Sequence, residues 1–226
     1  MKKISVLINA RLNSSRMKSK MIRPFHDTDL LEIALEKLDQ LNYFDNRFIA
    51  VAEESLIKKA SKYKNIEVLK RNTDSVESGP HHPMTTFEHY LRIPTEYFFV
   101  INSCAAFLSL DTIKRAYDCF QETNYRAYIS AVETRDWVFN SKGEPLTHNN
   151  PDALQNTSDG DFYLRATHAF YIANRDYFSH NDGKLWNLKA NDPHLITMPV
   201  EESFDVDTDL DFKVSELIYK KNKGFL

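Results

Sequence analysis

The sequence predicts an α/β protein built on a mostly parallel central sheet, and three observations support this fold class. Short apolar runs alternate along the chain with segments of helical periodicity, the pattern of a sheet covered by helices on both faces. The 226 residues, 42% of them hydrophobic and 27% charged, suit one folded domain with a substantial core. No repeat, low-complexity tract or linker divides the chain, so we expect a single domain over residues 1–226.

The individual elements follow from local patterns. Residues 4–8 are a continuous apolar run, typical of a strand buried on both faces. Leu31, Leu35 and Leu38 share one helical stripe, which predicts a helix over 29–38 with Thr28 as its N-cap. Further strands are expected at 47–52, 66–69, 97–101, 127–132, 169–172 and 195–199. Further helices are expected at 54–63, 84–91, 111–120 and 208–220.

Residues 136–161 interrupt the alternation of predicted strands and helices. Glycines, prolines and runs of asparagine punctuate the segment, and it shows neither strand nor helix periodicity. We interpret it as an insertion at about 136–165, a hairpin arm carried by the main sheet.

Composition excludes several classes of function. The net charge is 29 − 32 = −3, which leaves no broad basic face for nucleic acid. Cys104 and Cys119 are too few for a disulfide framework and indicate a reducing compartment. The apolar run near the N-terminus is too short for a signal peptide or a membrane span, so we expect a cytoplasmic protein with no membrane partner.

A basic loop follows the first strand. It carries Arg11, Arg16, Lys18 and Lys20 among small polar residues, including Asn13 and Ser14. Ligands of open α/β sheets bind outside the carboxyl ends of the strands, where this loop begins. Cations beside small side chains suit a polyphosphate, although a solvated basic loop has the same composition. The segment has no glycines and is not a P-loop.

An acidic cluster lies near the C-terminus. If residues 203–207 are extended, Asp205 and Asp207 point to one face, where two carboxylates suit Mg²⁺. Asp209 and Asp211 follow the expected N-cap Thr208. Acidic residues in the first turn of a helix are favoured by its macrodipole and need no metal.

Together these segments resemble a known family. Ile8-Asn9-Ala10-Arg11, with Ser14 and Lys20 beyond it, is similar to the I-P-A-R-x-x-S opening of the acylneuraminate cytidylyltransferases, the CMP-sialic acid synthetases. The stretch from Glu202 to Thr208, E-S-F-D-V-D-T, is similar to their E-S-I-D-I-D-T ending. Residues 165–172 resemble their R-x-N-G-A-x-Y-I strand, and Arg71 corresponds to the arginine of an R-P dipeptide. Ser14-Ser15-Arg16 is closer to the S-T-R of the related CMP-Kdo synthetases.

The resemblance implies a Rossmann-like three-layer sandwich of the nucleotide-diphospho-sugar transferase type. It implies attack of a sugar hydroxyl on the α-phosphate of CTP, with Mg²⁺ as cofactor and an acidic sugar as acceptor. It also implies a homodimer paired through the inserted arm. Carried over position by position, it assigns Arg11, Lys20 and Asp207 to catalysis and Asp205 and Asp207 to the metal. The residues it assigns to the nucleotide are Ala10, Arg11, Asn13, Ser14, Arg16, Lys20 and Arg71.

The acceptor side departs from the family pattern. Asn9 replaces a proline, Asn102 to Ala106 replace Q-P-T-S-P or the acidic G-D-E-P, and Thr167-His168 replace N-G. Asn102, Arg165 and His168 are candidate acceptor ligands. Each also has an ordinary interpretation, as a satisfied strand end, a surface ion pair and a core histidine, respectively.

Two other functions fit the same residues. A nucleotide-sugar-dependent glycosyltransferase also uses an Asp-x-Asp metal site, but usually at the end of a mid-chain strand. A non-catalytic nucleotide-binding homologue would explain the altered segment at 102–106.

Overall fold

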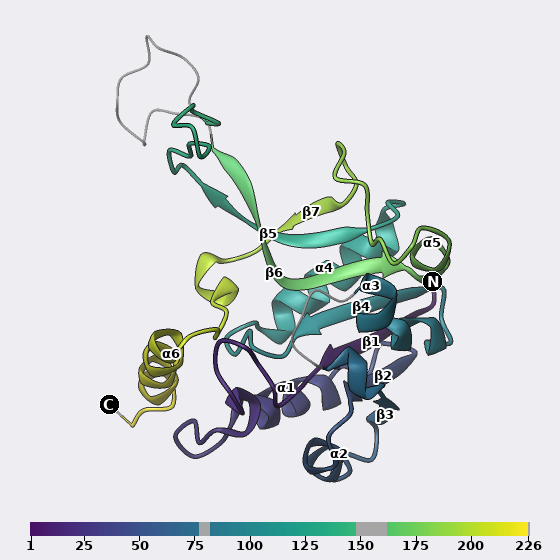
Figure 1. Cartoon of the computed structure of the whole chain (residues 1–226), viewed down its shortest axis with the longest axis vertical. Coiled ribbons are helices and arrows are strands. Elements are labelled where there is room, and N and C mark those ends of the chain that lie inside the picture. Colours follow the sequence, from purple (N-terminus) through teal and green to yellow (C-terminus); the bar gives the residue numbers. More distant parts are fainter. Residues whose placement is uncertain (77–81, 148–161, 226) are drawn as a thin grey trace.

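The computed structural model describes residues 1–76, 82–147 and 162–225 of the chain. Its centre is a seven-stranded sheet with the strand order β3-β2-β1-β4-β6-β5-β7 (Figure 1). The strands are β1 (Ile4–Asn9), β2 (Asn46–Val51), β3 (Glu67–Lys70), β4 (Tyr97–Asn102), β5 (Tyr128–Thr134), β6 (Tyr163–Asn174) and β7 (His194–Thr197). Only the two pairings of β6 are antiparallel, so the predicted mostly parallel sheet is confirmed.

Helices cover both faces of the sheet. The helices are α1 (Leu30–Asp39), α2 (Glu54–Ala60), α3 (Pro83–Thr86), α4 (Leu110–Glu122), α5 (Arg175–His180) and α6 (Asp209–Asn222). Buried side chains of α1, α2, α4 and α6 join one apolar cluster with the sheet. The 3₁₀ helix Glu88–Arg92 and α5 contribute Tyr90 and Phe178 to a second cluster on the other face. The predicted three-layer sandwich is therefore confirmed.

Side-chain alternation along β1 decides which residues reach the edge of the sheet. Val6 and Ile8 belong to the first apolar cluster and Leu7 to the second. Asn9 follows on the second face, where the alternation would place another apolar side chain. Asn9 lies opposite Asn102 of β4 in the parallel register, so two polar residues end two adjacent buried strands.

Several predicted elements differ from the structure. The N-cap of α1 is Asp29 and not Thr28, because the Asp29 carboxylate accepts the backbone N–H of Glu32 at 2.8 Å. The expected helix over 84–91 is split into α3 and a 3₁₀ helix, with Phe87 between them in a non-helical conformation. Short α5 was not predicted. Its N-cap is Asn174, whose side chain accepts from the N–H of Tyr177.

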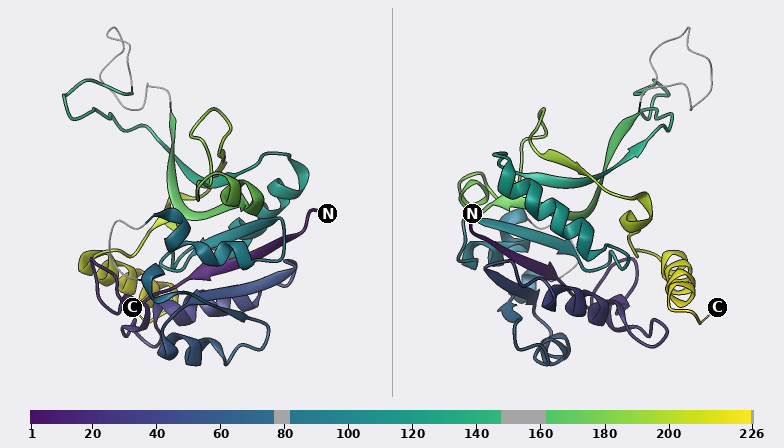
Figure 2. Two further views of the ribbon diagram at one scale, coloured as in Figure 1. Left: turned by 45° about the vertical axis from the view of Figure 1, so that its right-hand side comes forward. Right: turned by 180° about the vertical axis from the view of Figure 1, so that it is seen from behind.

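The insertion is partly built from regular strand. β6 begins at Tyr163 and not at 169, and it pairs with β5 as far out as Thr134. Figures 1 and 2 show β5 and β6 continuing beyond the other strands as a projecting arm. Beyond β5, a bridge between Phe139 and Pro145 closes a small hairpin. Residues 148–161 of the predicted insertion lie outside the described part of the chain.

The C-terminal helix returns to the beginning of the chain. Figure 2 shows α6 (yellow) beside the loop that follows β1 (purple). Phe212 of α6 packs against Phe25 with ring centroids 5.1 Å apart. The segment that precedes α6 is thereby brought close to the loop that follows β1. Among the described residues, no helix is both long enough and apolar enough to span a membrane.

Candidate functional site

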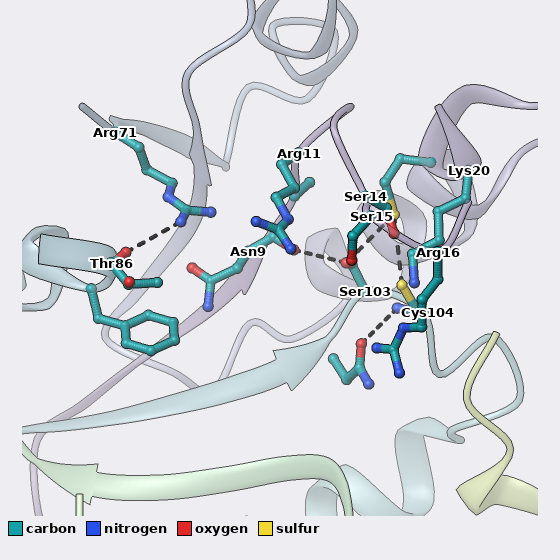
Figure 3. A pocket seen from close by; sticks show the side chains of 14 residues that line it. Asn9, Arg11, Ser14, Ser15, Arg16, Lys20, Arg71, Thr86, Ser103 and Cys104 are labelled. Atoms are coloured by element: carbon teal, nitrogen blue, oxygen red, sulfur yellow. Dashed lines mark hydrogen bonds between the residues drawn. The ribbon is translucent and has the colours of Figure 1, made fainter. Parts of the chain in front are cut away.

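A cavity of about 280 Å³ opens at the carboxyl ends of β1 and β4 (Figure 3). This is the edge at which ligands of parallel α/β sheets bind. Its lining residues come from four parts of the chain: Asn9, Ala10, Arg11, Ser14, Ser15, Arg16, Lys20, Met21, Arg71, Thr86, Phe87, Asn102, Ser103 and Cys104.

The loop after β1 forms the cationic wall of this cavity. The backbone N–H groups of Ser14 and Ser19 both donate to the carbonyl of Leu12, at 3.0 and 2.8 Å, and so fold the loop back on itself. Ser19 has a left-handed conformation with φ 56°, from which a short 3₁₀ helix starts at Lys20. This path brings Arg16 and Lys20 to the same side as Arg11, as the sequence predicts.

Lys20 and Asp207 are joined across 187 positions of sequence. The Lys20 ammonium donates to the Asp207 carboxylate at 3.0 Å and to the carbonyl of Val206 at 2.8 Å. The Arg16 guanidinium lies 2.9 Å from the other Asp207 oxygen. The acidic segment is therefore held against the basic loop by Arg16 and Lys20, both of which line the cavity.

Lys20 remains charged in this position. Its side chain is only 10% exposed, and burial lowers its pKa. Nearby Cys104 and the hydrogen bond to Asp207 act in the opposite direction and outweigh burial, so the pKa of Lys20 lies above its ordinary value. A buried ammonium held by a carboxylate is a fixed positive charge at the cavity wall.

Asp205 is held beside the turn that follows β4. The N–H of Val206 donates to the carbonyl of Cys104 at 3.2 Å. Asn102 stabilises the charged form of Asp205, and its side-chain oxygen accepts the N–H of Cys104 at 2.9 Å. Burial, and then the charge of Asp207, raise the pKa of Asp205.

The two carboxylates suit a divalent cation. Oδ1 of Asp205 is buried and has no hydrogen-bond partner within the described residues, which leaves an oxygen for a ligand. Mg²⁺ takes oxygen ligands and commonly binds one or two carboxylates together with water and substrate phosphates. No cluster of three or more His, Cys, Asp or Glu suited to a metal occurs in the described ranges, so phosphates and water would supply the remaining ligands. Asp205 and Asp207 fit that role.

The opposite wall of the cavity is built around Arg71. Its guanidinium is buried, donates to both the hydroxyl and the carbonyl of Ser75, and donates to the carbonyl of Thr86 at 3.2 Å (Figure 3). Phe87 places its ring beside Thr86 on the same wall. The predicted nucleotide ligand Arg71 thus faces the cavity from the side opposite the basic loop.

Other predicted site residues are dispersed. Ala10 and Ser14 line the cavity and are buried, whereas Asn13 is exposed and outside the lining. Arg165 is exposed on the outer part of β6, and it does not line the cavity at the carboxyl ends of β1 and β4. His168 is exposed with φ 56°, so its ordinary interpretation as a core histidine is wrong.

His168 lines a second cavity of about 650 Å³ over β5, β6 and β7. Trp186, Leu188 and His194 line it as well. Two of the three predicted acceptor ligands, Arg165 and His168, therefore lie apart from Asn102. Asn102 instead lines the first cavity and lies near Asp205.

Some cavity residues were not identified from the sequence. Thr86, Phe87 and Ser103 carry no motif, and Cys104 was noted only as one of two cysteines, not as a cavity residue. The pairing register between β1 and β4 would have identified Ser103 and Cys104, because it places the residues after Asn102 beside those after Asn9. Thr86 and Phe87 depend on the path of the chain between β3 and β4, which has no local signature.

Fold and cavity together define an α/β protein with a cavity lined by cationic side chains at the carboxyl edge of its sheet. The chain belongs to the cytidylyltransferase family, whose model matches residues 5–201. It is accordingly a CTP-dependent nucleotidyltransferase. The cytidylyltransferase part of the sequence resemblance is confirmed, and its assignment to the sialic acid branch stays a prediction.

Individual proteins are similar over almost the whole chain. Post-translational flagellin modification protein B of Campylobacter coli is 24% identical over 236 residues, covering 98% of this chain and 97% of that protein. The structure of CMP:2-keto-3-deoxy-manno-octonic acid synthetase complexed with CTP has a TM-score of 0.69 at 10% identity, covering 98% of this chain and 100% of that one. A 4-diphosphocytidyl-2C-methyl-D-erythritol synthase from Anaerococcus prevotii has a TM-score of 0.68 at 15% identity, covering 97% and 96%. These two structures share the fold.

Proposed function

We propose that this enzyme transfers CMP from CTP to an acidic keto-sugar of the sialic acid type, releasing pyrophosphate. The observation that carries the proposal is the pairing of Asp207 with Arg16 and Lys20, two cations that line the cavity at the carboxyl ends of β1 and β4. A nucleoside triphosphate needs cations for its phosphates and a metal that bridges phosphate to protein. Val206, which lies between the two carboxylates in the chain, donates its N–H to Cys104 of the cavity lining and so keeps Asp205 and Asp207 next to the cavity.

In the proposed reaction a sugar hydroxyl attacks the α-phosphorus of CTP. An O–P bond forms to the sugar, the bond between the α- and β-phosphates breaks, and the hydroxyl proton is released. Arg11, Arg16 and Lys20 would bind the triphosphate and neutralise the charge that develops on the departing pyrophosphate. Asp205 and Asp207 would hold Mg²⁺, which when bound shields the α-phosphate and lowers the pKa of the hydroxyl. Asn102 would orient the Asp205 carboxylate.

Two further observations support the choice of acceptor and pathway. The relative from Campylobacter coli is named for post-translational modification of flagellin, which supports a product used in surface glycans. The matched family favours nucleotidyl transfer over the glycosyltransferase alternative. A non-catalytic homologue is distinguished by binding of CTP with Mg²⁺ and no turnover with any acceptor.

A pyrophosphate-release assay tests the reaction. We expect release only with CTP among the four ribonucleoside triphosphates, and only when a keto-sugar that carries a carboxylate is present. Asp207→Asn should lower turnover by at least about 10²-fold, because it weakens a ligand of the proposed Mg²⁺ and the ion pairs that hold Lys20 and Arg16. Asp209→Asn is the matched control, since Asp209 lies two residues further on, is 71% exposed and pairs with Arg23. Equal turnover in the two variants would contradict the proposal.

We also propose that the arm pairs two copies of the chain. Large apolar side chains on its described part are exposed, among them Phe139 at 54%, Leu146 at 57% and Phe162 at 52%. A lone two-stranded ribbon has marginal stability in water, so these side chains gain by packing against a second copy. Light scattering should give twice the chain mass, and the double variant Phe139→Ser, Leu146→Ser should give the monomer mass. Leu210→Ser on α6 is the control for an equally exposed apolar residue, and a monomeric wild-type protein would refute the pairing.

A further inference from the structure

The end of β1 holds a buried polar network that the proposed reaction does not use. Asn9, where the resembling family has proline, is the last residue of the strand and lines the cavity. Its side-chain oxygen lies 2.8 Å from Nε2 of His89, and its amide nitrogen donates to the hydroxyl of Tyr90 at 2.8 Å. Both partners belong to the 3₁₀ helix that follows the Arg71 wall. Asn9 therefore ties that helix to the central strand.

The main chain at this position is fixed separately. The hydroxyl of Ser103 donates to the carbonyl of Asn9 at 2.8 Å, and the N–H of Ala10 donates to the carbonyl of Ala50 at 3.1 Å. The peptide that leads into Arg11 is thus held between β4 and β2. Because the backbone of Asn9 is already anchored, the contribution of its side chain is to place the 3₁₀ helix, and not to place the strand.

The hydrogen-bond donors and acceptors fix the state of His89. The Asn9 amide nitrogen donates to Tyr90, so the Asn9 oxygen accepts, and Nε2 of His89 carries the proton. Nδ1 is then an acceptor, and it is buried without a partner among the residues described. The ring is fully buried beside Arg71 and Arg92. Within the described part of the chain, the side chain of His89 makes one hydrogen bond, and that bond is to Asn9.

The network continues into the wall of the cavity. Phe87 stacks on Tyr90 with ring centroids 5.2 Å apart and 14° between the planes. Thr86, next to Phe87, accepts from Arg71. The positions of Phe87 and Arg71 therefore follow the position of the 3₁₀ helix, which Asn9 sets against β1.

We infer that Asn9 is a positioning residue for nucleotide binding, which holds the Arg71–Phe87 wall at a fixed distance from Arg11 through its bonds to His89 and Tyr90. The inference rests on the proposed function to the extent that the nucleotide occupies this cavity. Loss of the tie widens the cavity and weakens CTP binding, while the groups around the α-phosphate on the Lys20 side are unchanged. The KM for CTP should therefore rise with little change in kcat.

The first experiment compares Asn9→Ala with Ser5→Ala, and measures the dissociation constant and KM for CTP with Mg²⁺ and the thermal midpoint. Ser5 is the matched control. It is a fully buried residue of the same strand at the opposite end, and its hydroxyl also has two side-chain partners, Thr95 at 2.8 Å and Asn46 at 3.1 Å. Both variants should lower the thermal midpoint. Only Asn9→Ala should raise the dissociation constant and KM for CTP, by about tenfold, which is about 1.4 kcal/mol of binding free energy.

The second experiment separates positioning from stability at His89. His89→Phe keeps an aromatic ring of similar volume but loses the donor to Asn9, and it also removes the unpartnered Nδ1. His89→Gln keeps an N–H donor. We expect His89→Phe to raise the KM for CTP about as much as Asn9→Ala does, without a matching fall in the thermal midpoint. His89→Gln should keep the KM for CTP within about threefold of the wild-type value.

The outcomes distinguish this inference from the proposed function. Wild-type protein that binds no CTP would refute the nucleotide site itself. If the wild-type protein binds CTP, two results would refute the role of Asn9 alone. One is an Asn9→Ala variant whose KM for CTP changes no more than that of Ser5→Ala. The other is an equal KM for CTP in His89→Phe and His89→Gln.

Discussion

The two ends of β1 carry buried polar residues of contrasting character. At the amino end, the Ser5 hydroxyl pairs with Thr95 and Asn46, the Ser5 N–H donates to Thr95, and Thr95 donates to the carbonyl of Tyr97. At the carboxyl end, Asn9 leads into three cationic side chains, and two polar atoms nearby, His89 Nδ1 and Asp205 Oδ1, have no partner within the described chain.

This difference indicates which end of β1 is suited to bind a ligand. Buried polar atoms are nearly always hydrogen-bonded, because leaving one unpaired costs about 1–3 kcal/mol. The amino end satisfies its polar atoms internally and contributes to stability alone. The carboxyl end leaves a carboxylate oxygen and an imidazole nitrogen without partners among the described residues, at the edge of the sheet where ligands of parallel α/β proteins bind.

Lys20→Met should give the largest effect of this comparison. The variant removes a buried, fixed positive charge beside Asp207, and we expect kcat/KM for CTP to fall about 10³-fold. Lys18→Met is the control, because Lys18 belongs to the same loop but is exposed and does not line the cavity. Steady-state pyrophosphate release measures both variants. Comparable losses of kcat/KM in the two variants would show that the loop acts through its overall charge and not through the position of the Lys20 ammonium.

Thr95→Val should affect only stability. It leaves the buried N–H of Ser5 without an acceptor, so the free energy of unfolding should fall by up to about 3 kcal/mol. Denaturant unfolding measures the loss, and CTP titration under native conditions should give the wild-type dissociation constant. A weakened affinity would mean that the two ends of β1 are coupled, which would break the comparison.

Acid should destabilise the carboxyl end through His89. Burial, and then Arg71 and Arg92, lower the pKa of His89 to about 3, from an ordinary value of 6.5. Below pH 6.5, His89 binds a proton in the unfolded chain but not in the folded chain, so the free energy of unfolding falls as the pH decreases. At pH 5 this contribution is about 2 kcal/mol.

Unfolding at pH 7.5 and pH 5.0 tests this sign and size, with His89→Gln as the comparison because glutamine does not titrate. The variant should lose about 2 kcal/mol less than the wild type between the two values. An equal loss in both proteins would show that other groups account for the acid sensitivity.

The sequence by itself determined the fold class and the chemistry of the two end segments. Continuous apolar runs identify the buried strands, and an apolar period of 3.6 residues identifies the helices that cover them, because burial on two faces or on one face selects those patterns directly. The types of residue at Arg11, Lys20, Asp205 and Asp207 identified the two halves of the site, since phosphates need cations and Mg²⁺ needs carboxylates.

Only the tertiary structure decided how these halves meet and what closes the cavity. The 3.0 Å contact between Lys20 and Asp207 depends on β4 lying beside β1 and on α6 packing against Phe25, and neither pairing is local in sequence. The hydrogen bond between Asn9 and His89 likewise joins residues 80 positions apart. Local sequence sets the character of each segment, whereas long-range packing sets which polar atoms are satisfied and which stay available for a ligand.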